Sequence, residues 1–198
     1  QELVVSSKFG SPMGKGYNNQ GGSRRHLVSS LEASLKRLNT DYIDIYFLHR
    51  FDEDTPLEET LRALDDVVSQ GTVRYIGVSN FAAWQIAKAL GISAANDWTP
   101  FHCIQPMYNL IKRQAEVEIL PMAKSENIGV ITYNPLGAGL LAGKYGKNHT
   151  TGDGRLTTDD MYQKRYRDSW MFDAAKQFCG FAMETGYHPV SLAVAWVS

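Results

Sequence analysis

Short apolar runs recur along the chain, and longer amphipathic or polar stretches separate them. The runs are rich in Val and Ile and are continuous rather than alternating, which is typical of parallel strands covered on both faces. We expect strands at residues 3–7, 42–48, 73–78, 101–106 and 129–132.

The stretches between these runs carry apolar residues at helical spacing. Ser23 is expected to cap the first helix, and Thr55 with Glu58 predicts a capping box, with a proline at the first helical position, for the second. The third helix is expected to end at Gly91. This third helix is expected at residues 84–90, and later helices at residues 118–127, 172–185 and after 189.

Strands and helices therefore alternate, and the later strands start about every 30 residues, the spacing expected for eight units in a (β/α)₈ barrel. A doubly wound open sheet shows the same alternation, but the glycines at residues 14–16 and 21–22 lack the G-x-G-x-x-G spacing of that fold. We predict the α/β class and a TIM barrel that is incomplete here. Five of its eight strands are expected, in one partial barrel domain over residues 1–198.

The ends of the chain agree with an incomplete barrel. The sequence starts at Gln1 without an initiating Met and stops inside the apolar helical run at residues 191–197. We therefore expect that both ends are cut and that the N- and C-terminal barrel units are missing.

Composition excludes several classes of function. The net charge is -1 and Lys and Arg form no long run, which argues against nucleic acid or an anionic membrane as a partner. No apolar stretch approaches the roughly 20 residues of a membrane span. The histidines show no metal-ligand spacing, so no metal site is expected. Cys103 and Cys179 are interpreted as buried thiols in a reducing cytosol rather than as a disulfide.

Two polar residues at strand ends are the candidate catalytic groups, Lys8 after the first strand and His49 after the second. In a barrel of parallel strands the C-terminal strand ends form the floor of the active site, where such a pair can act as acid and base. Each residue alone has a structural alternative, a solvated or helix-paired lysine and a hydrogen-bonded histidine.

Polar and aromatic groups follow the later strands. Ser79, Asn80 and Gln105 have the chemistry to hold a carboxamide, and the ring of Tyr133 to stack on a flat heterocycle. Ser79 and Asn80 have the alternative role of capping the next helix, whereas the Gln105 amide must find partners inside an apolar strand. Lys144 is a candidate phosphate ligand or, alternatively, a solvated surface lysine.

Together these segments resemble the aldo-keto reductase superfamily, in its order and over essentially the whole chain. The wording of residues 48–52 and 105–110 is most similar to bacterial and plant reductases related to potassium-channel β subunits. The stretches that carry the resemblance are residues 4–8, 37–50, 71–81, 105–109, 133–136 and 144–145.

The resemblance implies an NADPH-dependent oxidoreductase that passes a hydride to the carbonyl carbon of an aldehyde or ketone while a tyrosine gives the proton. It implies that Lys8 lowers the pKa of that tyrosine and is held by an aspartate. It implies that His49 orients the carbonyl group of the small-molecule substrate.

The resemblance also implies the cofactor ligands. Ser79, Asn80 and Gln105 match the residues that bind the nicotinamide carboxamide, and Tyr133 matches the ring stacked on the nicotinamide. The loop along the cofactor phosphates is matched by Asn134, Pro135, Leu136, Gly137, Ala138 and Lys144. Residues 148–167 are expected to form a mobile flap over the cofactor.

The chain departs from the family at the proton donor. The family's Asp and Tyr lie upstream of the lysine strand, and the helix that grips the 2′-phosphate lies beyond the last residue here. The 198 residues alone are therefore expected to be inactive, whereas the intact parent is expected to be a cytoplasmic, NADP-dependent reductase. The alternatives are a non-catalytic NADP-binding module of the channel β-subunit type and an inactive truncated product.

Overall fold

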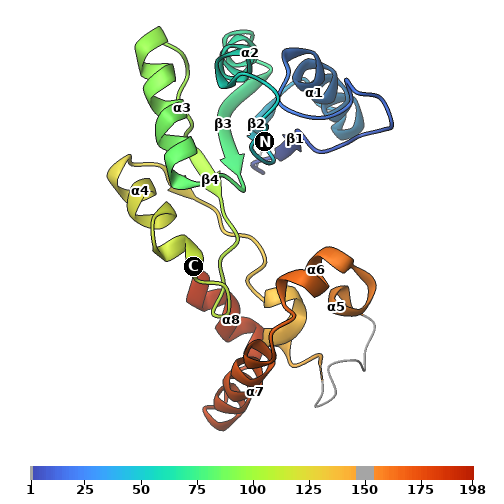
Figure 1. Cartoon of the computed structure of the whole chain (residues 1–198), viewed down its shortest axis with the longest axis vertical. Coiled ribbons are helices and arrows are strands. Elements are labelled where there is room, and N and C mark those ends of the chain that lie inside the picture. Colours follow the sequence, from blue (N-terminus) through green and yellow to red (C-terminus); the bar gives the residue numbers. More distant parts are fainter. Residues whose placement is uncertain (1, 146–153) are drawn as a thin grey trace. The chain divides into compact units, whose positions relative to one another are not determined.

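The computed structural model describes residues 2–145 and 154–198 (Figure 1). The chain divides into two compact units. The first comprises Gln1–Pro106 and Glu118–Ile131, and the second comprises Met107–Val117 and Thr132–Ser198. Each unit has its own hydrophobic core, and each is described by itself below.

The first unit is built on a five-stranded sheet in which all strands are parallel and follow one another in chain order. The α/β class is confirmed, and five parallel strands alternating with helices are consistent with part of a (β/α)₈ barrel. The strands are β1 (Ser6–Phe9), β2 (Ile43–Leu48), β3 (Val73–Ser79), β4 (Cys103–Gln105) and β5 (Gly129–Val130).

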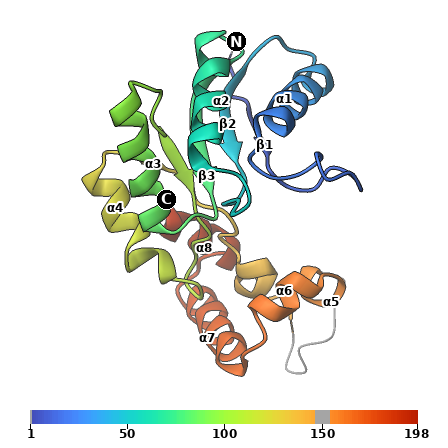
Figure 2. The same cartoon turned by 45° about the horizontal axis from the view of Figure 1, so that its top comes forward.

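Helices connect these strands and cover one face of the sheet, as Figure 2 shows for α1, α2 and α3. The helical stripes predicted from the sequence supply that layer, since Leu27, Leu61 and Leu64 are fully buried with Tyr46 and Ile76 of the strands. The helices of this unit are α1 (Arg24–Leu38), α2 (Leu57–Ser69), α3 (Ala83–Asn96) and α4 (Ile119–Ser125).

Local chemistry sets the helix ends, and the structure differs from the prediction at two of them. The Ser23 hydroxyl accepts from the His26 amide, so this cap is confirmed. The predicted capping box fails because Thr55 donates its hydroxyl to Asp52 instead, and Pro56 becomes the N-cap. Helix α3 runs through Gly91 and ends later, at a left-handed C-cap.

The strand boundaries also differ from the prediction at the two edges of the sheet. β1 begins at Ser6, and Leu3 and Val4 are 76% and 74% exposed. At the other edge β5 has only two residues, and Val130 and Ile131 are more than one-third exposed. The prediction of strands covered on both faces therefore holds for β2 but not for the edge strands.

The loops that follow β1 and β2 are joined by Asp52. Its carboxylate accepts from the Gly22 amide at 2.7 Å and from the Thr55 hydroxyl at 2.7 Å. Burial by itself raises the pKa of the Asp52 carboxyl, but these hydrogen bonds bring that pKa below its ordinary value. Gly21 has a φ of 81°, and a Cβ on it would lie 2.5 Å from the same carboxylate. Only glycine fits this approach of the two loops.

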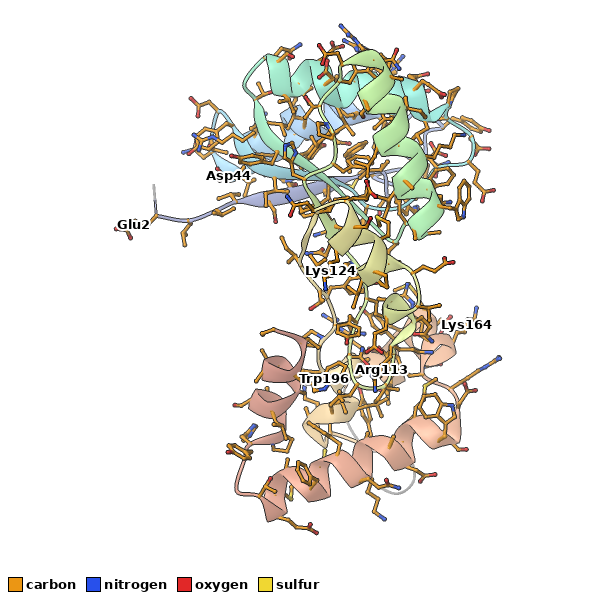
Figure 3. All side chains as sticks on the ribbon, turned by 90° about the vertical axis from the view of Figure 1, so that its left-hand side faces the viewer. Glu2, Asp44, Arg113, Lys124, Lys164 and Trp196 are labelled. Carbon is orange, nitrogen blue, oxygen red and sulfur yellow. The ribbon has the colours of Figure 1, made fainter. Side chains whose placement is uncertain are left out.

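The second unit is helical, and its core gathers around Leu141, Tyr166 and Met171. Its surface carries a pair shown in Figure 3, the Arg113 guanidinium lying 5.5 Å from the centre of the Trp196 ring. Its elements are η1 (Gln114–Glu116), η2 (Gly137–Ala142), α5 (Arg155–Thr158), α6 (Asp160–Arg165), α7 (Ser169–Glu184) and α8 (Pro189–Val197).

Helices α7 and α8 agree with the prediction, whereas α5 and α6 were not predicted. They occupy most of the described part of residues 148–167, which were expected to form a flap, and residues 148–153 lie outside the described residues. Both cysteines are free and buried, as predicted. Among the described residues, no helix is long and apolar enough to cross a membrane, and no group of side chains is suited to hold a metal ion.

Candidate active site

The register of the sheet places four of the predicted residues on one face. Side chains alternate along a strand, and those of Tyr46 and Leu48 belong to the core beneath the helices, so His49 faces the opposite side. Lys8 pairs with Phe47, Ser79 pairs with Gln105, and His49 follows the residue paired with Val78. Lys8, His49, Ser79 and Gln105 therefore share the helix-free face at the C-terminal end of the strands.

Lys8 lies inside β1, because the strand continues to Phe9 rather than ending at the lysine as predicted. Its ammonium lies 5.4 Å from the centre of the Phe47 ring, and burial lowers the pKa of the Lys8 side chain. None of the ion pairs found among residues 2–145 and 154–198 includes Lys8. A half-buried cation without a carboxylate partner is suited to interact with an anion or a developing oxyanion.

His49 is held by the loop that follows β1. The Ser11 hydroxyl lies 3.0 Å from Nδ1 of His49, and the His49 amide donates to the carbonyl of Phe9 at 2.8 Å. Burial lowers the pKa of His49, and the positive charges of Lys8 and Arg50 lower it further. The imidazole is therefore neutral near pH 7, and with Nδ1 engaged by Ser11, Nε2 is the nitrogen available to a substrate.

Ser79 and Asn80 do not cap the next helix, so that alternative is wrong. The Ser79 hydroxyl donates to the carbonyl of Gln105 at 2.7 Å, and the Asn80 amide donates to the carbonyl of His49 at 2.8 Å. At the N-terminus of α3, the side chain of Gln85 instead accepts from the backbone amide of Ala82. Ser79 and Asn80 thus join the ends of three neighbouring strands at this face.

Gln105 behaves differently from its neighbours. Its side chain is only partly buried, so the expectation that its amide must find an internal partner does not hold. Within the part of the chain that the structure describes, its side-chain amide makes no hydrogen bond. An amide with a free donor and a free acceptor at a strand end is suited to bind another amide.

The remaining predicted residues lie in the second unit. Tyr133 forms an isolated parallel β-bridge with Met107. Burial raises the pKa of the Tyr133 phenol, and the positive charge of Arg165 acts in the opposite direction. Asn134 follows in the left-handed conformation with φ 64°, and its side chain accepts from the Ala138 amide at 2.8 Å. The residues 134–139 therefore form a tightly folded loop at the start of η2.

A cleft of about 460 Å³ lies beside this loop. Two cations border it, the predicted Lys144 and also Arg155, the first residue of α5, which the sequence analysis missed. No carboxylate is among the described residues that line it, so the cleft favours an anion such as a phosphate. Five of the predicted residues line it: Asn134, Pro135, Leu136, Ala138 and Lys144.

The structure thus brings the predicted residues together in two sets, one in each unit. Lys8, His49, Ser79, Asn80 and Gln105 form the set of the first unit. Gly137, between Leu136 and Ala138, belongs to the loop of the second set without lining the cleft.

Sequence reasoning also missed Ser11 and Tyr166. The hydroxyl of Ser11 contacts His49, and the hydroxyl of Tyr166 accepts from the side chain of Asn134. Ser11 stands three residues after Lys8, a position without any pattern of its own. Tyr166 lies in the stretch interpreted as a flap.

Comparison with known proteins places the chain in a family. The family model described as Aldo/keto reductase family matches residues 1–198. A probable voltage-gated potassium channel subunit beta of Arabidopsis thaliana is 37% identical over 201 residues, which cover 98% of this chain and 60% of that protein. The versiconal hemiacetal acetate reductase of Aspergillus parasiticus is 33% identical over 198 residues, covering 95% and 57%.

A third relative is the L-glyceraldehyde 3-phosphate reductase of Escherichia coli (strain K12). It is 39% identical over 146 residues, which cover 73% of this chain and 42% of that protein. The chain therefore spans less than two thirds of the length of each of these relatives.

Proposed function

The chain belongs to the aldo/keto reductase family, and we propose that its activity is the reduction of aldehydes or ketones to alcohols with NADPH. Membership of the family implies NAD(P)H-dependent carbonyl reduction in general. The choice of NADPH, the residues that act and a cytoplasmic location are parts of the proposal, as is a single partial barrel domain.

The observation that carries the proposal is the placement of Lys8 and His49 on one face, at the same end of neighbouring parallel strands. His49 is neutral, and its Nε2 is available to donate to a carbonyl oxygen and hold the substrate in place. The Lys8 ammonium stabilises negative charge that develops on the proton donor or on the substrate oxygen. When bound, NADPH supplies the hydride.

Residues of each unit have the chemistry to bind part of the cofactor. Gln105 offers a free amide for the nicotinamide carboxamide, next to Ser79 and Asn80. The ring of Tyr133 is proposed to stack on the nicotinamide. The cleft with Lys144 and Arg155 has the charge to bind phosphate groups.

The proton donor is proposed to come from outside these 198 residues. The resemblance places an Asp and a Tyr before the lysine strand, and the relatives are longer than this chain. General-acid catalysis contributes about 10²–10⁴ in rate, so the 198 residues alone are expected to reduce carbonyls poorly.

The test is the exchange of Lys8 for methionine in the intact protein, with nitrobenzaldehyde as substrate and NADPH absorbance as the readout. We expect Lys8→Met to lower kcat by about 10²–10³ while the Kd for NADPH stays unchanged, because the lost charge acts on the reacting atoms. Lys124→Met is the matched control, since Lys124 is an exposed lysine of α4 and should leave turnover unchanged (Figure 3). Normal turnover in Lys8→Met would remove the assignment.

A second candidate function is a non-catalytic NADP-binding module. The observation that favours it is the match of plant channel β subunits over 98% of this chain. The same assay separates the two functions. The binding module would be supported if the intact protein binds NADPH tightly but none of the carbonyl compounds tested leads to oxidation of NADPH.

A further inference from the structure

The loop Asn134–Gly139 holds a backbone shape that is costly for ordinary residues. Its φ angles are 64° at Asn134, 54° at Gly137, 59° at Ala138 and 98° at Gly139. For a residue with a side chain, the left-handed region costs about 1–2 kcal/mol, and such conformations persist only where the surroundings enforce them. Asn134 and Ala138 both carry side chains, so something must hold this loop.

One group that holds it is the hydroxyl of Tyr166, beside the hydroxyl of Tyr145, which donates to the Ala138 carbonyl at 3.2 Å. The side chain of Tyr166 is 1% exposed, and its oxygen accepts from Nδ2 of Asn134 at 2.8 Å and from Nδ2 of Asn109 at 3.1 Å. Burial raises the pKa of Tyr166 to about 12, so the phenol keeps its proton near neutral pH. The hydroxyl donates to the sulfur of Met107, with 3.7 Å between the oxygen and the sulfur.

Asn109 completes the network from the other side. It is fully buried, and its Nδ2 also donates to the carbonyl of Asn134 at 3.0 Å. Its Oδ1 accepts from the amides of Ile111 and Lys112, both at 2.9 Å. Asn109 is therefore anchored to its own turn, and Tyr166 is positioned by it.

The chain of contacts then reaches the backbone of the loop. Oδ1 of Asn134 accepts from the Ala138 amide at 2.8 Å, so the side chain that Tyr166 holds is also the one that closes the turn. Tyr166 itself does not line the cleft beside the loop, whereas Asn134 and Ala138 do. Tyr166 can therefore affect a bound phosphate only through the loop.

We propose that Tyr166 is a positioning residue that pre-organises the loop Asn134–Gly139 for the phosphates of NADPH. This inference rests on the proposed function. A loop already held in its binding conformation loses little conformational entropy when the ligand arrives, so affinity increases without any new contact to the ligand. Without the hydroxyl, the buried amide of Asn109 and the partly buried amide of Asn134 lose an acceptor, and the loop relaxes toward ordinary φ values.

The test uses Tyr166→Phe, which keeps the ring and removes the oxygen alone. We expect the Kd for NADP⁺, measured by calorimetry, to weaken about tenfold, which corresponds to 1.4 kcal/mol. The control is Tyr46→Phe, because Tyr46 is equally buried and donates to the Leu27 carbonyl at 3.4 Å in the other unit. It should lower stability slightly and leave the Kd unchanged.

A second measurement needs no cofactor. Exchange of the Ala138 amide hydrogen, followed by NMR, should be at least about tenfold faster in Tyr166→Phe than in the wild type, as expected for local opening. If Tyr166→Phe does not fold, Asn109→Ala removes a donor to the same hydroxyl at a residue that does not line the cleft, and it should weaken NADP⁺ binding in the same direction.

The outcomes separate the two claims. A wild-type protein that binds no NADP⁺ overturns the proposed function, and with it the positioning role of Tyr166, whatever the exchange rate. An unchanged exchange rate or an unchanged Kd in Tyr166→Phe overturns the positioning role alone. Faster exchange together with the weaker Kd supports it.

Discussion

A single methyl group on Gly77 should disturb both the stability of the sheet and the position of the proposed catalytic lysine. Gly77 lies in β3 between Phe47 of β2 and Cys103 of β4. A Cβ built on it lies 2.6 Å from the carbonyl oxygen of Cys103, 2.7 Å from Cε1 of Phe47 and 2.8 Å from the sulfur of Cys103. The methyl group of Gly77→Ala would therefore be too close to three atoms, which belong to two neighbouring residues.

The magnitude follows from which of these atoms can move. Overpacking a core costs about 1–3 kcal/mol, and we expect the upper end of that range because the nearest atom belongs to the backbone of the neighbouring strand. In a domain of this size each kcal/mol lowers the melting temperature by about 2–4 °C, so the expected loss is roughly 6–12 °C. The Phe47 ring must shift as well, and Lys8 lies over that ring.

The assay is urea unfolding of Gly77→Ala beside Gly91→Ala. Gly91 lies inside α3 with no atom within 4 Å of an added Cβ, so alanine there should stabilise the protein by about 0.5–1 kcal/mol. Adding Phe47→Leu to Gly77→Ala should cost less than the sum of the single changes, because the smaller side chain makes room for the methyl group. An unfolding midpoint for Gly77→Ala equal to that of the wild type would refute the reasoning.

Two further predictions concern the two sets of site residues. The pKa of His49, followed by NMR, should lie below the usual value of about 6.5 and rise in Lys8→Met, because removal of the positive charge favours the imidazolium. The folded state then binds fewer protons than the unfolded state, so the free energy of unfolding should decrease as the pH falls from about 6.5 through the lower folded-state pKa. An equal His49 pKa in the wild type and in Lys8→Met would show that the two side chains are too far apart to interact. Tyr133→Ala should weaken NADPH binding by roughly 1–2 kcal/mol, whereas alanine at the exposed Tyr187 should not, and equal dissociation constants would exclude Tyr133 from the stack.

The part of the site on the sheet was predictable because it depends on periodicity. Parallel strands place their C-terminal ends together, so Lys8 and His49 had to share an edge once their strands were recognised. Hydrogen bonds within the loops carry no such period. The Ser11 contact to His49 depends on how a long polar loop folds back, which no spacing rule gives.

The errors at helix ends have a related cause, competition between local partners. Thr55 stands where a capping residue is expected, but its hydroxyl donates to the carboxylate of Asp52 instead of accepting from a helix amide. For α6, the side chain of Asp159 accepts from two amides of the first turn, and this cap was visible in the sequence but was not used. The prediction for residues 148–167 therefore missed α5 and α6, and a mobile flap over the cofactor stays a prediction.

Because Asp52 links the loops after β1 and β2, neither loop can be exchanged alone without the loss of these contacts. A chimera that received only residues 10–22 from a relative would place a foreign backbone against the Asp52 carboxylate, which needs the Gly22 amide and the close approach of Gly21. The same exchange includes Ser11, whose hydroxyl contacts Nδ1 of His49. Exchanges of either loop should therefore move both loops together.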